Sequence, residues 1–446
     1  MVAILSVGNE GMKRGARFIL YALMMALALC IVACSGGSNG PRETEGFTPR
    51  LDPETECSIT VAGHYNNFEA LEAEFNRFSE YYPNVKLTYV FMDGYSKSGS
   101  RILSTALAGS EAPDIFFTYP WMGGWEDGPE ILAASEDLSD PALGLDLSCI
   151  RSNLLKTENG QLLSVPIYTT TYGMMVNEDI FSKEGLKVPT TYEELLSTCE
   201  ALKAAGYSDP ILACSKGSGD LLYPLFYPYF CGQIAGDEKA LGELNSMDPR
   251  AGEYMRGALD LVADFMGRGY LNLENCNALK DNYEAVILRF FEGDVPMMLA
   301  TGSTVSGTEK RESKSEAFTE NPFTYSLHPV PSTSEGGYFV NTISIGFGVN
   351  KNSRNLDMAN EFMRFLVNTE ELNRMAKAKR MVTPCADMSL DSVYAPFQAL
   401  DENHFINVSE LGLSDEASSQ VTKAGYNVAL GNMTVDEAVG SFGSIK

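Results

Sequence analysis

The sequence predicts an α/β protein with two lobes, and three observations support this. Short apolar strands alternate with amphipathic helices near the start of the chain, which is typical of a parallel sheet covered by helices. The same alternation recurs further along the sequence. The chain also has 446 residues, more than one hydrophobic core usually fills. We therefore expect two α/β lobes rather than one.

The first structural unit is predicted within a short stretch of sequence. Residues 58–63 form an apolar strand, a helix follows, and residues 85–90 form the next strand after Pro83. Two strands joined by a helix indicate a parallel βαβ unit. The helix repeats its apolar residues every three or four positions, as a buried face requires. That face is made by Phe68, Leu71, Phe75, Phe78 and Tyr82.

Later elements follow from the same reasoning. Thr191 and Glu194 form a capping box, which predicts a helix that buries Leu195, Cys199 and Leu202. Further elements are predicted as a helix at 102–107, a strand at 115–118, a helix at 285–291, a strand at 295–299, a polar turn at 301–303 and a helix around 359–366.

The first forty residues predict export from the cytoplasm. Lys13, Arg14 and Arg17 precede an apolar run at 18–33, which is the pattern of a secretory leader. The cysteine after this run makes the leader resemble a bacterial lipoprotein signal, which implies a signal peptide at 1–33 and a lipidated Cys34. A retained transmembrane anchor is the alternative, although the run is shorter than the roughly 20 residues of a spanning helix. Residues 34–56 are polar and are expected to form a flexible tether.

Charge and cysteine content narrow the functional classes. There are 33 basic and 59 acidic residues, for a net charge of -26. This balance repels nucleic acid and anionic lipid headgroups, so membrane contact is expected only through the N-terminal lipid. The cysteines beyond the leader are scattered and are expected to be mostly small buried residues, with one or two unassigned disulfides left open.

The sequence contains no convincing catalytic or metal motif. Residues 36–40 match the Gly-x-Ser-x-Gly pattern of serine hydrolases, but they lie in the tether without a strand before or a helix after them. The three histidines are far apart and lack metal-ligand spacing. No Walker A loop or dinucleotide-binding glycine pattern occurs. We expect no enzymatic activity, no cofactor and no metal.

Three segments together resemble a known family. These are residues 106–116, residues 159–181 with their continuation to Leu195, and residues 290–298. They are similar to the extracellular solute-binding proteins, family 1, which serve ABC importers and include maltose-binding proteins. The segments occur in the family's order along the chain. The resemblance implies a type II periplasmic-binding-protein fold, in which two lobes close on a solute about a hinge with three crossings.

The resemblance also implies a division of the chain and a function. The protein is expected to be a monomer on the extracytoplasmic face of the bacterial cell membrane that delivers a carbohydrate, such as an oligosaccharide, to the permease subunits. Lobe 1 is expected at 57–167 and 302–345, lobe 2 at 172–296 and 350–446, and the crossings near 167–171, 297–301 and 345–349.

Candidate solute contacts follow from what a sugar site needs, namely aromatic platforms and hydroxyl or amide groups. Both tryptophans lie in the loop after the 115–118 strand, at a sheet edge where ligands bind in open α/β folds. Alternatively, one of them packs the loop, and Asn66 or its neighbour caps the following helix. Further candidates lie at or beside the expected crossings, where their side chains would either stack on a solute or line the hinge. The set is Tyr65, Asn66, Tyr119, Trp121, Trp125, Tyr168, Tyr172, Thr301, Ser303 and Asn341.

Other functions remain open from the sequence. The same fold could bind a polyamine, a peptide or a metal chelate, and a cationic solute would require several carboxylates in the cleft. The expected cleft loops carry aromatic and neutral polar groups, which favours a neutral solute. A membrane-tethered glycan hydrolase or adhesin is the alternative from another class. A hydrolase needs two carboxylates across the cleft, and no convincing pair is found.

Overall fold

The computed structural model describes residues 47–445 apart from 97–99, 214–221, 279–282 and 401. Pro49–Lys446 form one compact unit. The predicted signal peptide at 1–33 and Cys34 lie outside the described residues. Among the helices described, none has both the length and the apolar character to cross a membrane.

The compact unit contains two sheets, which confirms the α/β prediction. The first sheet has the strand order β10-β9-β3-β1-β2, with β4 also paired to β9. β1 pairs in parallel with β2 and β3, while β9 is antiparallel to β3 and β4. Its strands are β1 (Cys57–Gly63), β2 (Val85–Phe91), β3 (Ile115–Thr118), β4 (Val165–Thr170), β9 (Phe339–Val349) and β10 (Phe405–Asn407).

The second sheet has four strands in the order β6-β7-β5-β8. β5 is antiparallel to both β7 and β8, and β6 is parallel to β7. A large apolar core surrounds this sheet and includes Met175, Phe226 and Phe290. The strands are β5 (Tyr172–Asn177), β6 (Ile211–Leu212), β7 (Met297–Thr301) and β8 (Tyr325–His328).

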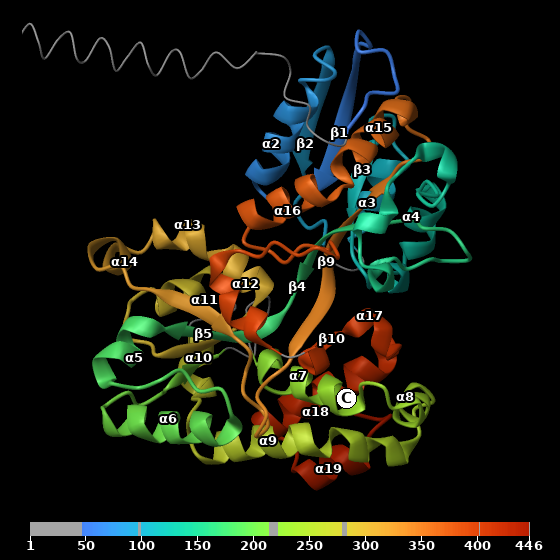
Figure 1. Ribbon diagram of the computed structural model, residues 1–446. Coiled ribbons are helices and arrows are strands. Elements are labelled where there is room, and N and C mark those ends of the chain that lie inside the picture. The colour runs from blue at the N-terminus through green and yellow to red at the C-terminus, as the bar shows by residue number, and fades with distance from the viewer. Residues whose placement is uncertain (1–46, 97–99, 214–221, 279–282, 401, 446) are drawn as a thin grey trace, which may run out of the picture. The chain divides into compact units, whose positions relative to one another are not determined.

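Helices cover both sheets (Figure 1). Those that pack with the first sheet or with one another beside it are α2 (Glu69–Phe78), α3 (Ile102–Leu107), α4 (Gly128–Ala134), α15 (Leu356–Leu366) and α16 (Thr369–Ala378). The others are α5 (Glu178–Glu184), α6 (Tyr192–Ala204), α7 (Tyr223–Ile234), α8 (Glu238–Asn245), α9 (Arg256–Gly267), α10 (Leu273–Ala278), α11 (Tyr283–Phe290), α12 (Gly302–Ser306), α13 (Thr308–Glu312), α14 (Glu316–Glu320), α17 (Val408–Leu411), α18 (Asp415–Ala429) and α19 (Val435–Gly440).

The periodicity arguments hold for the first βαβ unit. All five residues of the predicted apolar face are buried, although Phe68 is the cap of α2 and Tyr82 follows its end. The Thr191–Glu194 capping box is present at the start of α6. The strand predicted at 295–299 is shifted to β7, and Thr301 caps α12 instead of lying in a turn. The alternative that an asparagine caps α2 is wrong, because the cap position is Phe68 and has no side-chain hydrogen bond.

The tether is shorter than predicted. It was expected to extend to residue 56, yet the backbone is already bound to the fold at Arg50 and Leu51. The Arg50 amide donates to Glu361 Oε1 at 2.8 Å, and the Leu51 amide donates to the Tyr82 hydroxyl at 3.2 Å. The Tyr82 hydroxyl in turn donates to Glu361 at 2.6 Å. These hydrogen bonds attach residues 50 and 51 to the fold, although the polar composition of the segment predicted a flexible tether.

The expected division of residues 302–345 is wrong. The chain does not return to the first sheet after β7, because α13 packs on α11 and β8 pairs with β5 of the second sheet. The cause is an aromatic cluster in which the ring of Phe318 lies 4.9 Å from Phe291 and 5.0 Å from Phe323. The return occurs between β8 and β9, so the crossing expected at 297–301 is misplaced.

The division of residues 350–446 is also wrong at its start. Residues 345–349 lie within β9 beside β3, and α15 and α16 then pack on α2 of the first sheet. Phe362 contacts the rings of Phe75 and Phe78, and the Arg77 guanidinium donates to Glu371 at 2.7 and 3.0 Å. The chain returns to the second sheet only after α16, where the 3₁₀ helix η7 (Ser392–Ala399) contacts β8.

Candidate functional site

One cavity of about 400 Å³ is lined by residues from both sheets and their helices. β4 and β5 belong to different sheets and meet at Thr171, inside the first expected crossing. Thr170 and Tyr172, on either side of this junction, both line the cavity. The full lining is Pro120, Trp121, Lys156, Thr170, Tyr172, Tyr223, Tyr227, Thr301, Ser303, Thr342, Ile343, Ser344, Val408, Leu413, Asp415 and Ser418. We call it the cleft cavity.

The loop after β3 places a tryptophan ring on one wall of the cleft cavity. Trp121 is 49% exposed, which is unusual for so large an apolar side chain. Its ring stacks on Tyr119, with centroids 5.2 Å apart and planes at 13°. Tyr119 is buried and its hydroxyl is hydrogen-bonded to His64 Nδ1 at 2.5 Å. One face of the indole is therefore supported by a fixed ring, and the side chain remains open to a ligand.

His64 supports this stack as a neutral group. Burial, together with the positive charge of Lys379, lowers the pKa of His64 to about 4. Burial is also the main reason that the pKa of the Tyr119 hydroxyl is raised. Neither group carries charge near neutral pH, so the bond between them is a neutral hydrogen bond. The stack is thus held by packing and hydrogen bonding, without an ion pair.

A tyrosine cluster forms the opposite wall. Tyr223 and Tyr227 of α7 stack with centroids 4.2 Å apart, and Tyr172 of β5 packs edge-on against Tyr223 at 4.9 Å. Tyr227 is only 2% exposed, and its hydroxyl is hydrogen-bonded to Ser418 Oγ of α18 at 3.1 Å. These rings pack against one another, so this wall presents little free ring surface.

Polar groups of the cleft cavity are mostly hydroxyls. They come from Thr170, Thr301, Ser303, Thr342, Ser344 and Ser418, and Lys156 and Asp415 are the charged side chains in the lining. One positive and one negative group leave the lining with no net charge. Hydroxyls that can both donate and accept suit a neutral, hydroxyl-rich solute.

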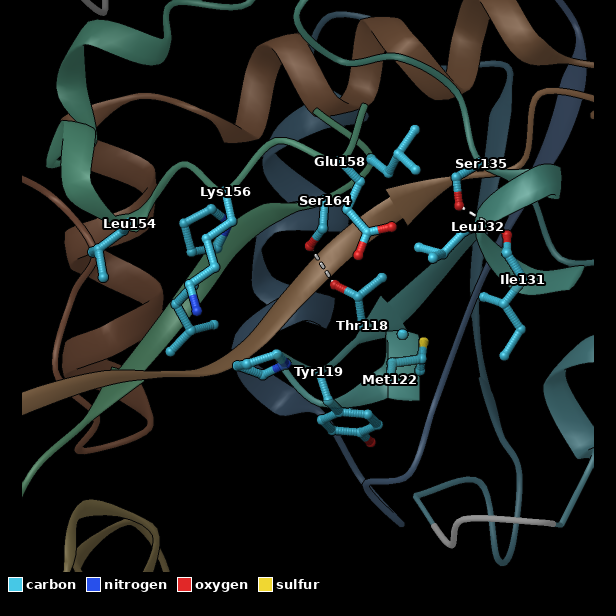
Figure 2. Close-up of a pocket in the computed structure, with 15 residues that line it drawn as sticks. Thr118, Tyr119, Met122, Ile131, Leu132, Ser135, Leu154, Lys156, Glu158 and Ser164 are labelled. Atoms are coloured by element: carbon cyan, nitrogen blue, oxygen red, sulfur yellow. Dashed lines mark hydrogen bonds between the residues drawn. The ribbon is translucent and has the colours of Figure 1, made fainter. Parts of the chain in front are cut away.

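A smaller cavity of about 110 Å³ lies beside the Trp121 loop (Figure 2). It shares Pro120, Lys156 and Ile343 with the cleft cavity. Thr118 and Ser164 point toward one another across it and are hydrogen-bonded (Figure 2). Its remaining lining is largely apolar and comes from the first sheet, α4 and the loops and 3₁₀ turns beside them, including Met122, Leu154 and Leu163. The smaller cavity is therefore a side chamber behind the tryptophan wall.

Five of the ten predicted contact residues meet at or directly behind the cleft cavity. Trp121, Tyr172, Thr301 and Ser303 line it, and Tyr119 supports Trp121 from the side chamber. Thr301 also caps α12, because its hydroxyl accepts from the Thr304 amide. Whether these residues bind a solute remains a prediction.

The other five candidates do not line the cleft cavity. Trp125 and Tyr168 are buried, and the Tyr168 hydroxyl donates to the Met375 carbonyl at 3.2 Å. Asn341 is buried, and its amide donates to Thr169 Oγ1 and the Thr170 carbonyl. Tyr65 is half-buried with the Lys379 ammonium 4.8 Å from its ring centre, and Asn66 is exposed.

Sequence reasoning missed part of the lining. The missed residues, which were not proposed as contacts, are Lys156, Tyr223, Tyr227, Asp415 and Ser418. Asp415 and Ser418 begin α18, whose cap is Ser414. This serine before two acidic residues is a helix-start signal, but it carries no information on what the helix faces. Among the described residues, no cluster of three or more His, Cys, Asp or Glu side chains could hold a metal ion.

Comparison with known proteins identifies the class of this fold. Among solved structures, RafE in complex with raffinose is 16% identical, with a TM-score of 0.63, and the match covers 87% of this chain and 99% of RafE. The GacH receptor of Streptomyces glaucescens, solved unliganded and with acarbose, is 17% identical with a TM-score of 0.64, covering 87% and 97%. A Bacillus licheniformis sugar transporter in complex with stachyose is 16% identical with a TM-score of 0.60, covering 86% and 98%. At these identities the likeness shows a shared fold, the two-lobe fold of solute-binding proteins.

The family follows from the sequence. The family model described as bacterial extracellular solute-binding protein matches residues 62–372. This chain therefore belongs to the bacterial extracellular solute-binding proteins, a family of non-catalytic binding proteins that work outside the cytoplasm. A sequence search of curated proteins finds no match. Family membership confirms the prediction that the protein is not an enzyme.

Proposed function

We propose that the protein binds a neutral carbohydrate, such as an oligosaccharide, in the cleft cavity and delivers it to the permease of an ABC importer. The observation that carries this proposal is the half-exposed Trp121 ring, supported by Tyr119, on the wall of a cavity rich in hydroxyls. Sugars offer an apolar C–H face for such a ring and hydroxyls for the surrounding polar groups. The structural neighbours solved with raffinose, stachyose and acarbose support the same solute class.

The charge of the lining argues against the alternatives. A polyamine would require several carboxylates, and Asp415 is the acidic side chain in the lining. Lys156 balances that charge, so a strongly cationic or anionic solute would leave an uncompensated charge in the closed cleft. A hydrolase would need two facing carboxylates, which this lining does not offer.

Closure requires a hinge, which we place at the segments where the chain passes between the sheets. These are Thr171, the stretch between His328 and Phe339, and the stretch between Ala378 and Ser392. A solute drives closure only by binding the closed form more tightly than the open form. Because the cleft lining is drawn from both sides of these segments, closing would bring more hydroxyls onto the same solute.

The membrane attachment is a separate proposal. Lys13, Arg14 and Arg17, the apolar run at 18–33 and Cys34 support a lipid anchor at the outer face of the cell membrane. In bacteria grown with labelled palmitate, the full-length chain should incorporate label and Cys34→Ala should not. Equal labelling of both chains would exclude this anchor.

The solute class is tested by thermal unfolding of the protein with a panel of sugars. The panel contains raffinose, stachyose, acarbose and chitin oligosaccharides, with spermidine, a tripeptide and an iron chelate as competing classes. A solute at about 100 times its Kd stabilises the folded chain by roughly 2.7 kcal/mol, which raises Tm clearly. A shift with one glycan and recovery of that glycan unchanged would support the proposal. A shift only with a competing class would overturn it.

A further inference from the structure

Two cysteines that are far apart in sequence lie on paired backbone segments. Cys149 ends the 3₁₀ helix η3 (Leu147–Cys149), and Cys385 lies in the segment that returns from α16 to the second sheet. Ile150 and Cys385 form an antiparallel bridge. The Ala386 amide donates to the Cys149 carbonyl at 2.9 Å, and the Arg151 amide donates to the Pro384 carbonyl at 3.1 Å.

This backbone pairing holds the segments of the two cysteines next to each other. The bridge pairs Cys385 with Ile150, so Cys149 is one position further along the facing segment, and two backbone hydrogen bonds join the segments. Disulfides join residues on such neighbouring segments, with Cα atoms about 4.4–6.8 Å apart. We propose that Cys149 and Cys385 form a disulfide in the exported protein, although both are free thiols in this structure.

The side chains interact as a thiol pair. A hydrogen bond with Cys385 is the largest cause of the raised pKa of the Cys149 thiol. The pKa of Cys385 is lowered, first by its hydrogen bond with Cys149 and then by Thr383 and the charge of Arg151, while burial opposes this. Cys385 is thus the stronger thiolate former of the two. Cys149 is half-buried and Cys385 is fully buried, so an external oxidant reaches Cys149 first.

The chemistry balances with a disulfide-containing oxidant, either a protein disulfide donor or oxidised glutathione. The Cys149 sulfur attacks the oxidant's disulfide, a mixed disulfide forms, and the released sulfur takes the Cys149 proton. The Cys385 sulfur then attacks the Cys149 sulfur and expels the oxidant's other sulfur, which takes the Cys385 proton. The two cysteines lose two electrons and two protons, and the oxidant becomes a dithiol or two thiols. Extracellular proteins meet such oxidants.

The position of this bond would brace the hinge. Arg151 Nη2 donates to the Thr383 carbonyl at 2.9 Å and to Asn341 Oδ1 at 2.7 Å. The Asn341 amide donates to the Thr170 carbonyl at 3.1 Å, and Thr170 lines the cleft cavity. A disulfide beside this chain of hydrogen bonds would fasten the third crossing segment to the first lobe without entering the cleft.

Peptide mapping of the exported full-length chain tests the pairing. The chain is unfolded in denaturant that already contains the alkylating reagent, so that every free thiol is blocked as it is exposed, and trypsin then releases 102–151 and 381–423, each with a single cysteine. We expect these two peptides linked, with a mass two hydrogen atoms below their sum, and separated by reductant. Full alkylation of both peptides, even after exposure to oxidised glutathione, would overturn the proposal. A link from either cysteine to another cysteine would also overturn it.

Stability gives an independent measurement. A cross-link across so long a segment restricts the unfolded chain, and the Tm of Cys149→Ser should fall by about 5 °C. Reductant should lower the Tm of the wild type by the same amount and leave the variant unchanged. Cys57→Ser is the matched control, because Cys57 is also half-buried and free, and it should retain the sensitivity to reductant. A wild-type Tm that is the same with and without reductant would contradict the proposal.

Discussion

The two walls of the cleft cavity are both aromatic, yet they are built differently. On the first-sheet side, Trp121 is 49% exposed and rests on the buried Tyr119. On the second-sheet side, Tyr223 and Tyr227 stack on each other, and Tyr227 is 2% exposed. One wall therefore presents a ring to the cavity, while the other uses its rings for packing. The hydroxyls of the cavity come from both sides, since Thr170, Thr342 and Ser344 belong to strands of the first sheet.

This difference separates two parts of recognition. A free ring binds any solute with an apolar face and discriminates little between stereoisomers. Fixed hydroxyls require partners at particular positions and so discriminate between isomers. In the proposed function, the Trp121 ring supplies most of the affinity, and the hydroxyls of the cavity, those of the tyrosine wall among them, supply the preference for one glycan. The predictions that follow test this assignment.

The largest expected effect is a loss of stability in Trp125→Ala, which distinguishes the roles of the two tryptophans of the same loop. Trp125 is 7% exposed, and its ring lies 6.1 Å from that of Tyr119. Trp125→Ala should lower the free energy of unfolding by about 3 kcal/mol, because it leaves a cavity behind the wall. Urea denaturation measures this loss, and Trp125→Phe should restore much of it. Unchanged stability would mean that Trp125 is not a packing residue.

Trp121→Ala should weaken solute binding and leave stability nearly unchanged, in contrast to Trp125→Ala. We expect the affinity for the glycan found in the thermal screen to fall roughly 30-fold, about 2 kcal/mol, because the open ring is lost. The free energy of unfolding should change by less than about 0.5 kcal/mol, since the side chain is half-exposed. Calorimetric titration measures the affinity, and Trp121→Phe should keep part of it. An unchanged Kd would remove the functional difference between the walls.

Acid should weaken the support of the tryptophan wall. The pKa of His64 is lowered to about 4, so between pH 6.5 and 4 the unfolded chain binds a proton that the folded chain excludes. Neutral His64 therefore stabilises the folded chain above pH 6.5. Its contribution to the free energy of unfolding is lost as the pH falls, by about 1 kcal/mol between pH 7 and 5.5. His328, whose pKa is also about 4, adds a similar loss. Denaturation at several pH values across this range measures the free energy of unfolding, which should fall less steeply with falling pH in His64→Asn than in the wild type.

The smallest expected effect belongs to the tyrosine wall. Tyr227→Phe removes the hydroxyl that bonds Ser418 and should weaken glycan binding about 3-fold, less than 1 kcal/mol. Its clearer signature should be a reduced preference among isomeric sugars. Tyr229→Phe, on the same helix but outside the cavity lining, is the control and should bind as the wild type does. A larger loss for Tyr227→Phe than for Trp121→Ala would reverse the assignment of the walls.

The fold could be predicted from sequence where structure depends on local pattern. Periodicity fixed the apolar face of α2, and the capping box placed α6, because both signals act within a few residues. The second and third crossings could not be placed that way. They depend on contacts such as Phe318 with Phe291 and Phe362 with Phe75, which join segments far apart in sequence.

The site shows the same limit at the scale of single residues. Trp121 could be found because it lies in a loop after a strand, where ligands commonly bind. Tyr168 and Thr170 belong to the same strand, yet Tyr168 bonds to the Met375 carbonyl in the core while Thr170 reaches the cavity. The aromatic side chain of Tyr168 made it a candidate solute contact. The packing of α16 against β4 keeps that side chain in the core, away from the cavity. Asp415 comes from a helix near the end of the chain, with no motif to connect it to the cleft.

The position of both tryptophans in one loop has an optical consequence. The chain contains 2 tryptophans, Trp121 and Trp125, and they lie four positions apart beside the cleft. Indole fluorescence of the whole protein therefore originates from this single loop. The exposed ring should emit at longer wavelength than the buried one, and a bound glycan should shift that emission to the blue. The protein carries its own reporter of cleft occupancy, readable without any label.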